Sequence, residues 1–195
     1  MFMKKQLKFE TIQRELQKVV TKYQLSSFID FGCSAGLTSF IAREVGFTDI
    51  SSLDHDVEYI AMLKEIVKHQ KVTNIKPSTF SFGDPLSIQS EVMFVGALIH
   101  WVFSCTANFG EFNSIFRYLE TAVTQFLFIE WIDPTDSAIT EFNHLDCGEN
   151  GKLNKEEYSV KNFEKGLKSF GEIQANIPVD GGGTRVLYIV KKHHS

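Results

Sequence analysis

Apolar side chains in the first half of the chain recur alternately at the helical and the strand period. Residues 1–24 are expected to form an N-terminal helix, whose amphipathic part carries apolar side chains at Ile12, Leu16, Val19, Val20 and Tyr23. A short apolar run follows and ends at Asp30, which predicts a buried strand. The same alternation continues with helices expected at 35–45 and 56–70, and strands at 48–54 and 74–82. The third strand is the weakest of these because Pro77 suits an edge strand.

The second half of the chain continues the alternation and then breaks it. A fully apolar run predicts a fourth strand at 92–101, followed by a helix at 109–123 and a fifth strand at 125–131. After the polar stretch 132–159, the pattern predicts a helix at 160–170 and two strands at 172–179 and 184–192. The sequence DGGG between these two strands is typical of a turn, so the chain is expected to end in a hairpin.

Strands that alternate with helices, and are apolar on both faces, predict a doubly wound α/β fold. We therefore expect one domain over residues 1–195, built on a mostly parallel seven-stranded sheet with an antiparallel C-terminal hairpin. In such sheets a ligand binds beyond the carboxyl ends of the strands, so the turns after the strands are the places to search for a site.

Composition narrows the class of protein. The formal net charge of −4 disfavours a protein that coats duplex nucleic acid by neutralising phosphates. The three cysteines, Cys33, Cys105 and Cys147, are widely scattered, which suits a reducing compartment better than a disulfide framework. The longest apolar run, 92–103, falls short of the roughly 20 residues that a membrane helix needs. We expect a cytoplasmic protein that does not bind a membrane.

The turn after the first strand reads DFGCSAG, residues 30–36. A dinucleotide-binding fingerprint requires glycine where Ser34 stands, and a P-loop requires a lysine that this turn lacks. A pyrophosphate ligand is therefore poorly supported. Asp30 would repel an anion but suits a ligand that bears an ammonium group, while Gly32 and Gly36 allow a tight turn and a close approach.

Three aspartates end three successive predicted strands. Asp54 is placed to accept both hydroxyl groups of a ribose, and Asp84 could accept a hydrogen bond from an adenine amino group. Each has an ordinary alternative, because the sequence DHD precedes a helix that Asp56 could cap and Asp84 stands in a turn before Pro85. Together the three acids indicate a nucleoside site without phosphates.

This combination resembles the class I S-adenosylmethionine-dependent methyltransferases over residues 26–192. The stretches IDFGCSAG, LDHD, FGDP and VGALIHW are similar to the family's first four motifs, and the last hairpin to its reversed final strand. The resemblance implies a Rossmann-like methyltransferase fold with S-adenosylmethionine as cofactor. It implies that the methionine lies at Asp30 and residues 32–36, the ribose at Asp54, and the adenine at Asp84 between His55 and Phe82 or Pro85. The residues it assigns to the cofactor are Asp30, Gly32, Cys33, Ser34, Ala35, Gly36, Asp54, His55, Gly83, Asp84, Pro85, Ala97 and Leu98.

The acceptor side is less defined. The stretches ALIHW, FIEWIDPTDSAI and TRVLYIVKK are similar to methyltransferase domains that act on polysaccharide or other small acceptors. We therefore expect methyl transfer to a small-molecule or glycan-type acceptor by in-line displacement, for which the enzyme chiefly supplies positioning. The alternatives are a module that binds S-adenosylmethionine or a nucleoside without turnover and, less favoured, a NAD-dependent oxidoreductase.

His100 and Glu130 are the catalytic candidates, with Trp101 and Asp133 nearby in the predicted strand ends. His100 has a pKa suited to a general base but could equally be a hydrogen-bonded core histidine. Glu130 lies in an apolar run and needs a partner: it could orient His100, bind substrate, or pair with a lysine or a helix end.

Residues 146–157 resemble a calcium-binding loop that lacks one oxygen ligand at Gly148. Such loops also usually work in pairs, so no metal site is expected. The segment 132–159 is better explained as a polar loop over the acceptor side that acts as a lid.

Overall fold

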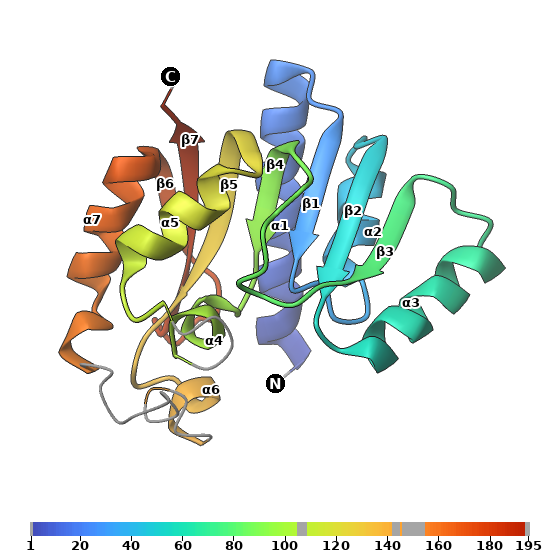
Figure 1. Cartoon of the computed structure of the whole chain (residues 1–195). Coiled ribbons are helices and arrows are strands. Elements are labelled where there is room, and N and C mark those ends of the chain that lie inside the picture. The colour runs from blue at the N-terminus through green and yellow to red at the C-terminus, as the bar shows by residue number, and fades with distance from the viewer. Residues whose placement is uncertain (1, 105–108, 142–144, 146–154, 194–195) are drawn as a thin grey trace.

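Seven strands form one sheet in the order β3-β2-β1-β4-β5-β7-β6 in a computed structural model (Figure 1), which describes residues 2–104, 109–141, 145 and 155–193. The strands are β1 (Ser27–Phe31), β2 (Asp49–Asp54), β3 (Ile75–Thr79), β4 (Ser90–Val95), β5 (Val123–Ile132), β6 (Gly171–Pro178) and β7 (Arg185–Lys192). β1 to β5 pair in parallel, and β7 runs antiparallel between β5 and β6. This confirms the predicted doubly wound, mostly parallel sheet with an antiparallel C-terminal hairpin.

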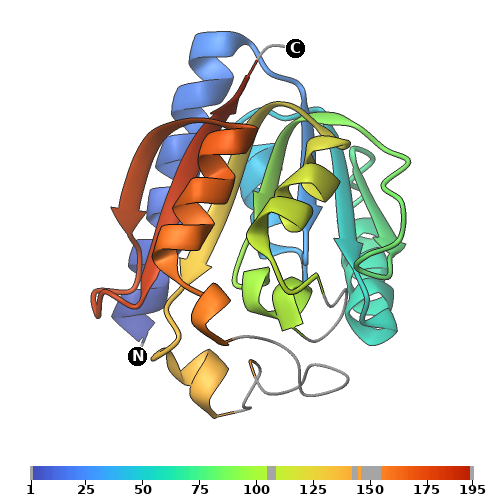
Figure 2. The same ribbon diagram turned by 60° about the vertical axis from the view of Figure 1, so that its left-hand side comes forward.

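Helices cover both faces of the sheet (Figures 1 and 2). One face carries α1 (Phe2–Tyr23), α2 (Leu37–Glu44) and α3 (Val57–His69), and the other carries α4 (Ile99–Ser104), α5 (Phe112–Glu120) and α7 (Val160–Phe170). The short helices α6 (Ser137–Thr140) and η2 (Lys155–Glu157) follow β5. No helix in the described part of the chain combines the length and apolar character needed to span a bilayer.

Strand periodicity divides the core between these two faces. Phe28 of β1 packs in one apolar cluster with Ile12 and Leu16 of α1, whereas its neighbours Ile29 and Phe31 belong to the cluster under α4, α5 and α7. Successive side chains of a strand point to opposite faces, so a strand buried on both faces is apolar throughout. The aromatic content is concentrated in the second cluster, where Phe112, Phe116, Tyr158, Phe163 and Trp131 pack ring against ring.

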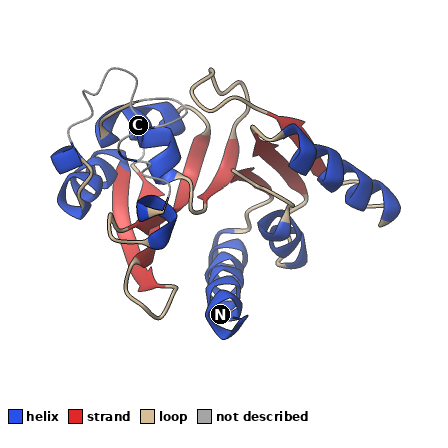
Figure 3. Cartoon of the chain, turned by 90° about the horizontal axis from the view of Figure 1, so that it is seen from below, coloured by secondary structure: helices blue, strands red, loops and turns tan. Residues whose placement is uncertain are grey.

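The carboxyl ends of the parallel strands meet at the lower end of the molecule in Figure 1, where the N-terminal end of α1 and helix α6 also lie. Figure 3 views this end directly and shows α1 on one side of the curved sheet. The N-terminal helix therefore starts at the edge of the sheet where the predicted site residues gather.

The predicted fourth strand, 92–101, is wrong at its carboxyl end. The strand β4 stops at Val95, Gly96 and Ala97 turn the chain with Ala97 at φ 49°, and α4 begins at Ile99. An uninterrupted apolar run does not distinguish a buried strand from a buried helix, and α4 is buried on nearly all sides. His100 and Trp101 consequently lie on a helix and not at the end of a strand.

Smaller differences arise at other element ends. The helix predicted at 109–123 spans Phe112–Glu120, because Val123 already belongs to β5. The third strand ends at Thr79, ahead of the predicted end at Phe82. Most of the calcium-loop resemblance at 146–157 lies outside the described residues, as does the central part of the predicted lid.

Candidate functional site

The turn between β1 and α2 is held tightly against β2. The backbone amides of Gly32 and Cys33 both donate to the carbonyl of Leu53, at 2.8 and 3.0 Å. Gly32 and Gly36 have φ values of 84° and 85°, which favour glycine. A Cβ atom on Gly36 would also lie 2.4 Å from Cδ1 of Leu63 in α3. Both glycines of the turn are therefore required by its geometry.

Asp54 fixes the middle of this turn from the end of β2. Its Oδ2 accepts from the amide of Ser34 at 2.7 Å, and its Oδ1 accepts from the amide of Asp56 at 3.0 Å. Ser34 has a φ of 47°, a left-handed conformation that is uncommon for a residue other than glycine. A carboxylate has about four acceptor sites, so Asp54 keeps capacity for further donors.

In the sequence DHD, residues 54–56, the side chain that caps the following helix is Asp56 and not Asp54. The Asp56 side chain accepts from the amides of Glu58 and Tyr59 and caps α3. Nδ1 of His55 lies 3.3 Å from Oδ1 of Asp54. The Asp54 carboxylate is thus directed at the turn and does not cap α3.

Asp30 lies beneath the turn. It is 1% exposed, and its Oδ2 accepts from the hydroxyl group of Ser39 at 2.6 Å, which in turn contacts Ser52 at 2.7 Å. Burial raises the pKa of Asp30 to about 7, opposed in part by the Ser39 hydrogen bonds. A direct contact with a ligand, as predicted from the sequence, would require the turn to open.

We expect Asp30→Asn to stabilise the fold at pH 8 by roughly 2–4 kcal/mol, because each pKa unit corresponds to about 1.4 kcal/mol. The raised pKa makes the wild-type stability greatest below the unfolded pKa near 4, and that stability is lost as the pH rises toward 7. The amide is neutral throughout, so the gain should be small at pH 4.5. Urea unfolding of both proteins at the two pH values measures this, and an equal difference at both would contradict it.

The predicted adenine side is a more open loop after β3. Tyr118 of α5 holds it, since its hydroxyl group donates to the carbonyl of Asp84 at 2.8 Å and accepts from the amide of Gly83 at 3.3 Å. Asp84 and the following Pro85 are exposed. The rings of His55 and Phe82 lie 5.4 Å apart at the same end of the sheet. The residues predicted to border the adenine therefore lie at the same edge of the sheet as Asp54.

A cavity of about 440 Å³ joins the turn to two distant segments. It is lined by Lys8, Phe9, Gly32, Cys33, Ser34, Ala35, Leu37, Thr38, Phe94, Gly96 and Arg185. The turn residues from 32 to 35 form one wall, α1 supplies a second, and β7 contributes the arginine. Burial raises the pKa of the Cys33 thiol, so this cysteine faces the cavity as a neutral side chain.

Glu130 is paired with Lys8 of α1. The ammonium group of Lys8 donates to Oε2 of Glu130 at 2.7 Å, which is the lysine alternative named above. Phe128, two residues earlier in β5, packs in the cluster that contains α1, so Glu130 faces α1 as well. Helix α4, which carries the 2% exposed His100, packs on the opposite face with Val102 and Phe103. The two catalytic candidates therefore lie on different sides of the sheet.

Arg185 and Asp136 form a second ion pair at this end of the sheet, which was not predicted. Nε and Nη2 of Arg185 donate to the two carboxylate oxygens of Asp136 at 2.9 and 2.8 Å, and Thr184 donates to Oδ2 at 2.7 Å. The guanidinium group holds the pKa of Asp136 well below its usual range. The partners are 49 positions apart, so no local pattern indicates the pair. Asp133, a further candidate, bonds to Thr135 in the turn before α6.

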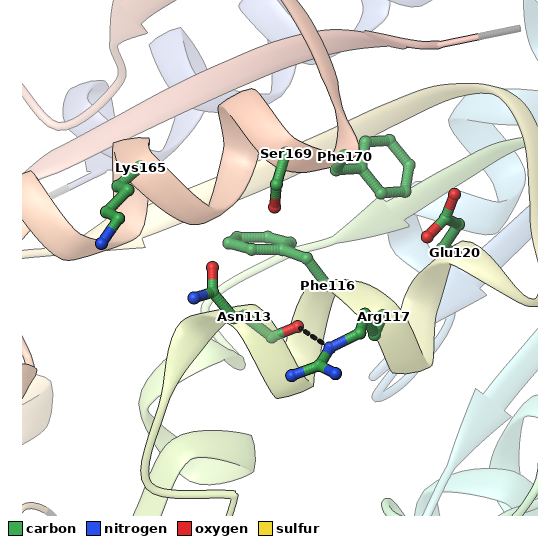
Figure 4. A pocket seen from close by; sticks show the side chains of 7 residues that line it. All are labelled: Asn113, Phe116, Arg117, Glu120, Lys165, Ser169 and Phe170. Carbon is green, nitrogen blue, oxygen red and sulfur yellow. Dashed lines mark hydrogen bonds between the residues drawn. The ribbon is translucent and has the colours of Figure 1, made fainter.

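A separate hollow of about 340 Å³ lies between α5 and α7. Figure 4 shows the side chains that line it: Asn113, Phe116, Arg117, Glu120, Lys165, Ser169 and Phe170. None of the predicted site residues is among them. Over the residues that the structure describes, no group of three or more His, Cys, Asp or Glu side chains is placed to hold a metal ion.

Comparison with known proteins gives a family and a fold. Residues 1–121 match the model of the family described as tellurite resistance protein TehB. No curated protein sequence matched the chain.

Solved structures of the same fold include the magnesium protoporphyrin IX methyltransferase of Synechocystis PCC 6803 with bound SAH (S-adenosylhomocysteine). It has a TM-score of 0.67 at 12% identity, over 95% of this chain and 83% of that one. TehB from Haemophilus influenzae has a TM-score of 0.60 at 14% identity, over 92% of this chain and 62% of that one. The N-methyltransferase NodS from Bradyrhizobium japonicum has a TM-score of 0.63 at 10% identity, over 94% and 98%. At identities this low, the structural matches establish a shared fold.

Proposed function

The chain belongs to the family of the tellurite resistance protein TehB, and from that premise we propose that it binds S-adenosylmethionine and transfers its methyl group to a small-molecule or glycan-type acceptor. The observation that carries the proposal is the turn at 32–36, locked to β2 by Asp54. It offers a close backbone approach and a ribose-binding carboxylate at one edge of the sheet. SAH bound to the Synechocystis enzyme of the same fold supports the choice of cofactor.

In this proposal the cofactor lies across the carboxyl ends of β1, β2 and β4. The methionine part lies along the turn at 32–36, where Gly32 leaves room for backbone contact and Leu98 packs beneath it. The ribose hydroxyl groups donate to Asp54, and the adenine lies near Asp84 beside the rings of His55 and Phe82, whose centroids, 5.4 Å apart, are too close to admit it between them. Gly83, Pro85 and Ala97 complete the loops that border these subsites.

The chain contributes positioning to the transfer. The sulfonium group of the cofactor supplies an electrophilic methyl group, and the acceptor must be held in line with it. Phe9, Leu37 and Phe94 give the cavity an apolar wall. His100 is buried on α4, so its use as a base requires that helix to move when the acceptor binds.

A turnover assay separates an enzyme from a binding module. The protein is incubated with S-adenosylmethionine and a panel of hydroxyl, carboxylate and alkylamine acceptors, and SAH formation is measured. We expect SAH to form with at least one acceptor class above the rate without acceptor. SAH binding without turnover on any acceptor class would favour the non-catalytic module.

A further inference from the structure

The ion pair between Lys8 and Glu130 is incomplete within the protein. Glu130 is 1% exposed and Lys8 is 17% exposed, so the pair is largely removed from water. Only Oε2 of Glu130 is bonded, and Oε1 has no hydrogen-bond partner among the described residues. A buried carboxylate oxygen without a donor is costly, since such groups are nearly always paired in native structures. Its partner Lys8 lines the cavity described above, so a ligand bound there could supply the donor.

The strand register places Glu130 beside Gly96, a residue that lines the cavity together with Lys8. Val95 of β4 pairs with Ile129 of β5, so Gly96 and Glu130 follow at the same level at the two strand ends. Gly96, Lys8 and the turn residues 32–35 line one cavity. The ring of Phe94 packs over Gly96, so Glu130 is connected to the cavity through Lys8, which lines it.

The charges of the pair match those of an α-amino acid. Lys8 has three N–H donors, of which Glu130 uses one, and Glu130 keeps one oxygen free. An α-amino acid carries an ammonium group and a carboxylate on one carbon atom. Its ammonium group would face Glu130 and its carboxylate would face Lys8, so the four charges would sum to zero.

Two other charged groups near the turn, Asp30 and Arg185, are already engaged within the protein. Asp30 is sealed beneath it by Ser39, and Arg185 is held by both oxygens of Asp136. Asp54 is proposed to bind the ribose, so Glu130, whose Oε1 has no partner among the described residues, is left for the amino-acid head.

We propose that Lys8 and Glu130 receive the amino-acid head of the cofactor, with its ammonium group donating to Oε1 of Glu130 and its carboxylate accepting from Nζ of Lys8. This inference rests on the proposed function. It assigns α1, which lies outside the motifs of the first strand, a direct part in cofactor binding. It also gives Glu130 a binding role in place of the catalytic role expected from the sequence.

Calorimetric titration with three nucleosides tests this assignment. The probes are SAH, S-adenosyl-3-thiopropylamine, which keeps the ammonium group but lacks the carboxylate, and 5′-methylthioadenosine, which lacks both. Glu130→Gln should weaken SAH and the thiopropylamine by about tenfold or more, the usual size for a lost charged hydrogen bond. Lys8→Met should weaken SAH alone by a similar factor. Neither change should alter 5′-methylthioadenosine binding more than about twofold.

The ion pair between Lys18 and Glu15, farther along α1, is a matched control. It joins Nζ and Oε1 at 2.8 Å, and neither residue lines the cavity. Lys18→Met and Glu15→Gln should leave all three affinities unchanged. A thermal melt of each variant checks that it folds, and if Glu130→Gln does not fold, the wild type and Lys8→Met still give the carboxylate comparison.

The outcomes distinguish a failure of this inference from a failure of the proposed function. Equal SAH affinity in the wild type, Lys8→Met and Glu130→Gln would overturn the inference and leave the proposed function intact. A loss of turnover without a loss of SAH affinity would also overturn it and would assign the pair to the acceptor. No binding of SAH or 5′-methylthioadenosine by the wild type would overturn both.

Discussion

Asp54→Ala should weaken SAH binding by more than about a hundredfold. The side chain is 6% exposed and is proposed to accept hydrogen bonds from two ribose hydroxyl groups. A hydrogen bond to a charged group contributes about 1.5–3 kcal/mol, and each 1.4 kcal/mol is a tenfold change in affinity. The alanine variant also loses the bond to the Ser34 amide, so the turn that contacts the methionine is loosened. Titration calorimetry with SAH measures the change.

Asp56→Ala is the control for this prediction because the same substitution is made two residues away. Asp56 caps α3, and its loss should cost about 1 kcal/mol of stability. The SAH affinity should change little, since its side chain points to the helix amides. A comparable loss of affinity in both variants would mean that Asp54 acts through the local fold and does not contact the ribose.

Asp136→Ala should lower the free energy of unfolding by about 3–5 kcal/mol, the usual cost of removing one partner of a buried ion pair. Asp136 is 6% exposed, and the change leaves Arg185 without its bidentate partner. The same carboxylate accepts from the amide of Ala138 and caps α6. Chemical denaturation at pH 7 gives the free energy of unfolding.

The pH dependence of this contribution follows from the lowered pKa of Asp136. A carboxylate whose folded pKa is depressed stabilises the protein above its unfolded value near 3.9, and that contribution is lost as the pH falls below it. The penalty of Asp136→Ala should therefore be constant from pH 5 to 7 and shrink under more acid conditions.

The exposed pair of Lys76 and Asp49, also at 2.7 Å, is the control. Asp49→Ala should cost less than about 1 kcal/mol at any pH. A cost as large as that of Asp136→Ala would contradict the role assigned to burial.

The sequence predicts the fold well because each strand and helix carries its own periodicity. The strands ending at Asp30 and Asp54 follow from short apolar runs that stop at an acid, and the hairpin follows from two strands separated by DGGG. The boundary between β4 and α4 was missed because the run from Val92 to Phe103 is almost entirely apolar and mostly buried, so it shows neither the strand nor the helix period. As a result, His100 was predicted at the end of a strand but lies on helix α4.

Site residues that depend on long-range contacts could not be found from local patterns. Lys8 and Glu130 are 122 positions apart, and the only signal was a charged residue in the apolar run FIEW. That signal correctly predicted that Glu130 needs a partner but not which one. The burial of Asp30 is of the same kind, because its depth is set by the way α2 and Ser39 close over it.

The central claim is that the turn at 32–36 and Asp54 form the binding site of S-adenosylmethionine. Titrating the full chain with SAH and, separately, with NAD tests it most directly. We predict saturable binding of SAH with one site per chain. Binding of NAD should be at least about a hundredfold weaker, because Ser34 stands where a dinucleotide-binding turn has the glycine that lets the pyrophosphate approach the backbone. Binding of NAD with no detectable binding of SAH would contradict the claim.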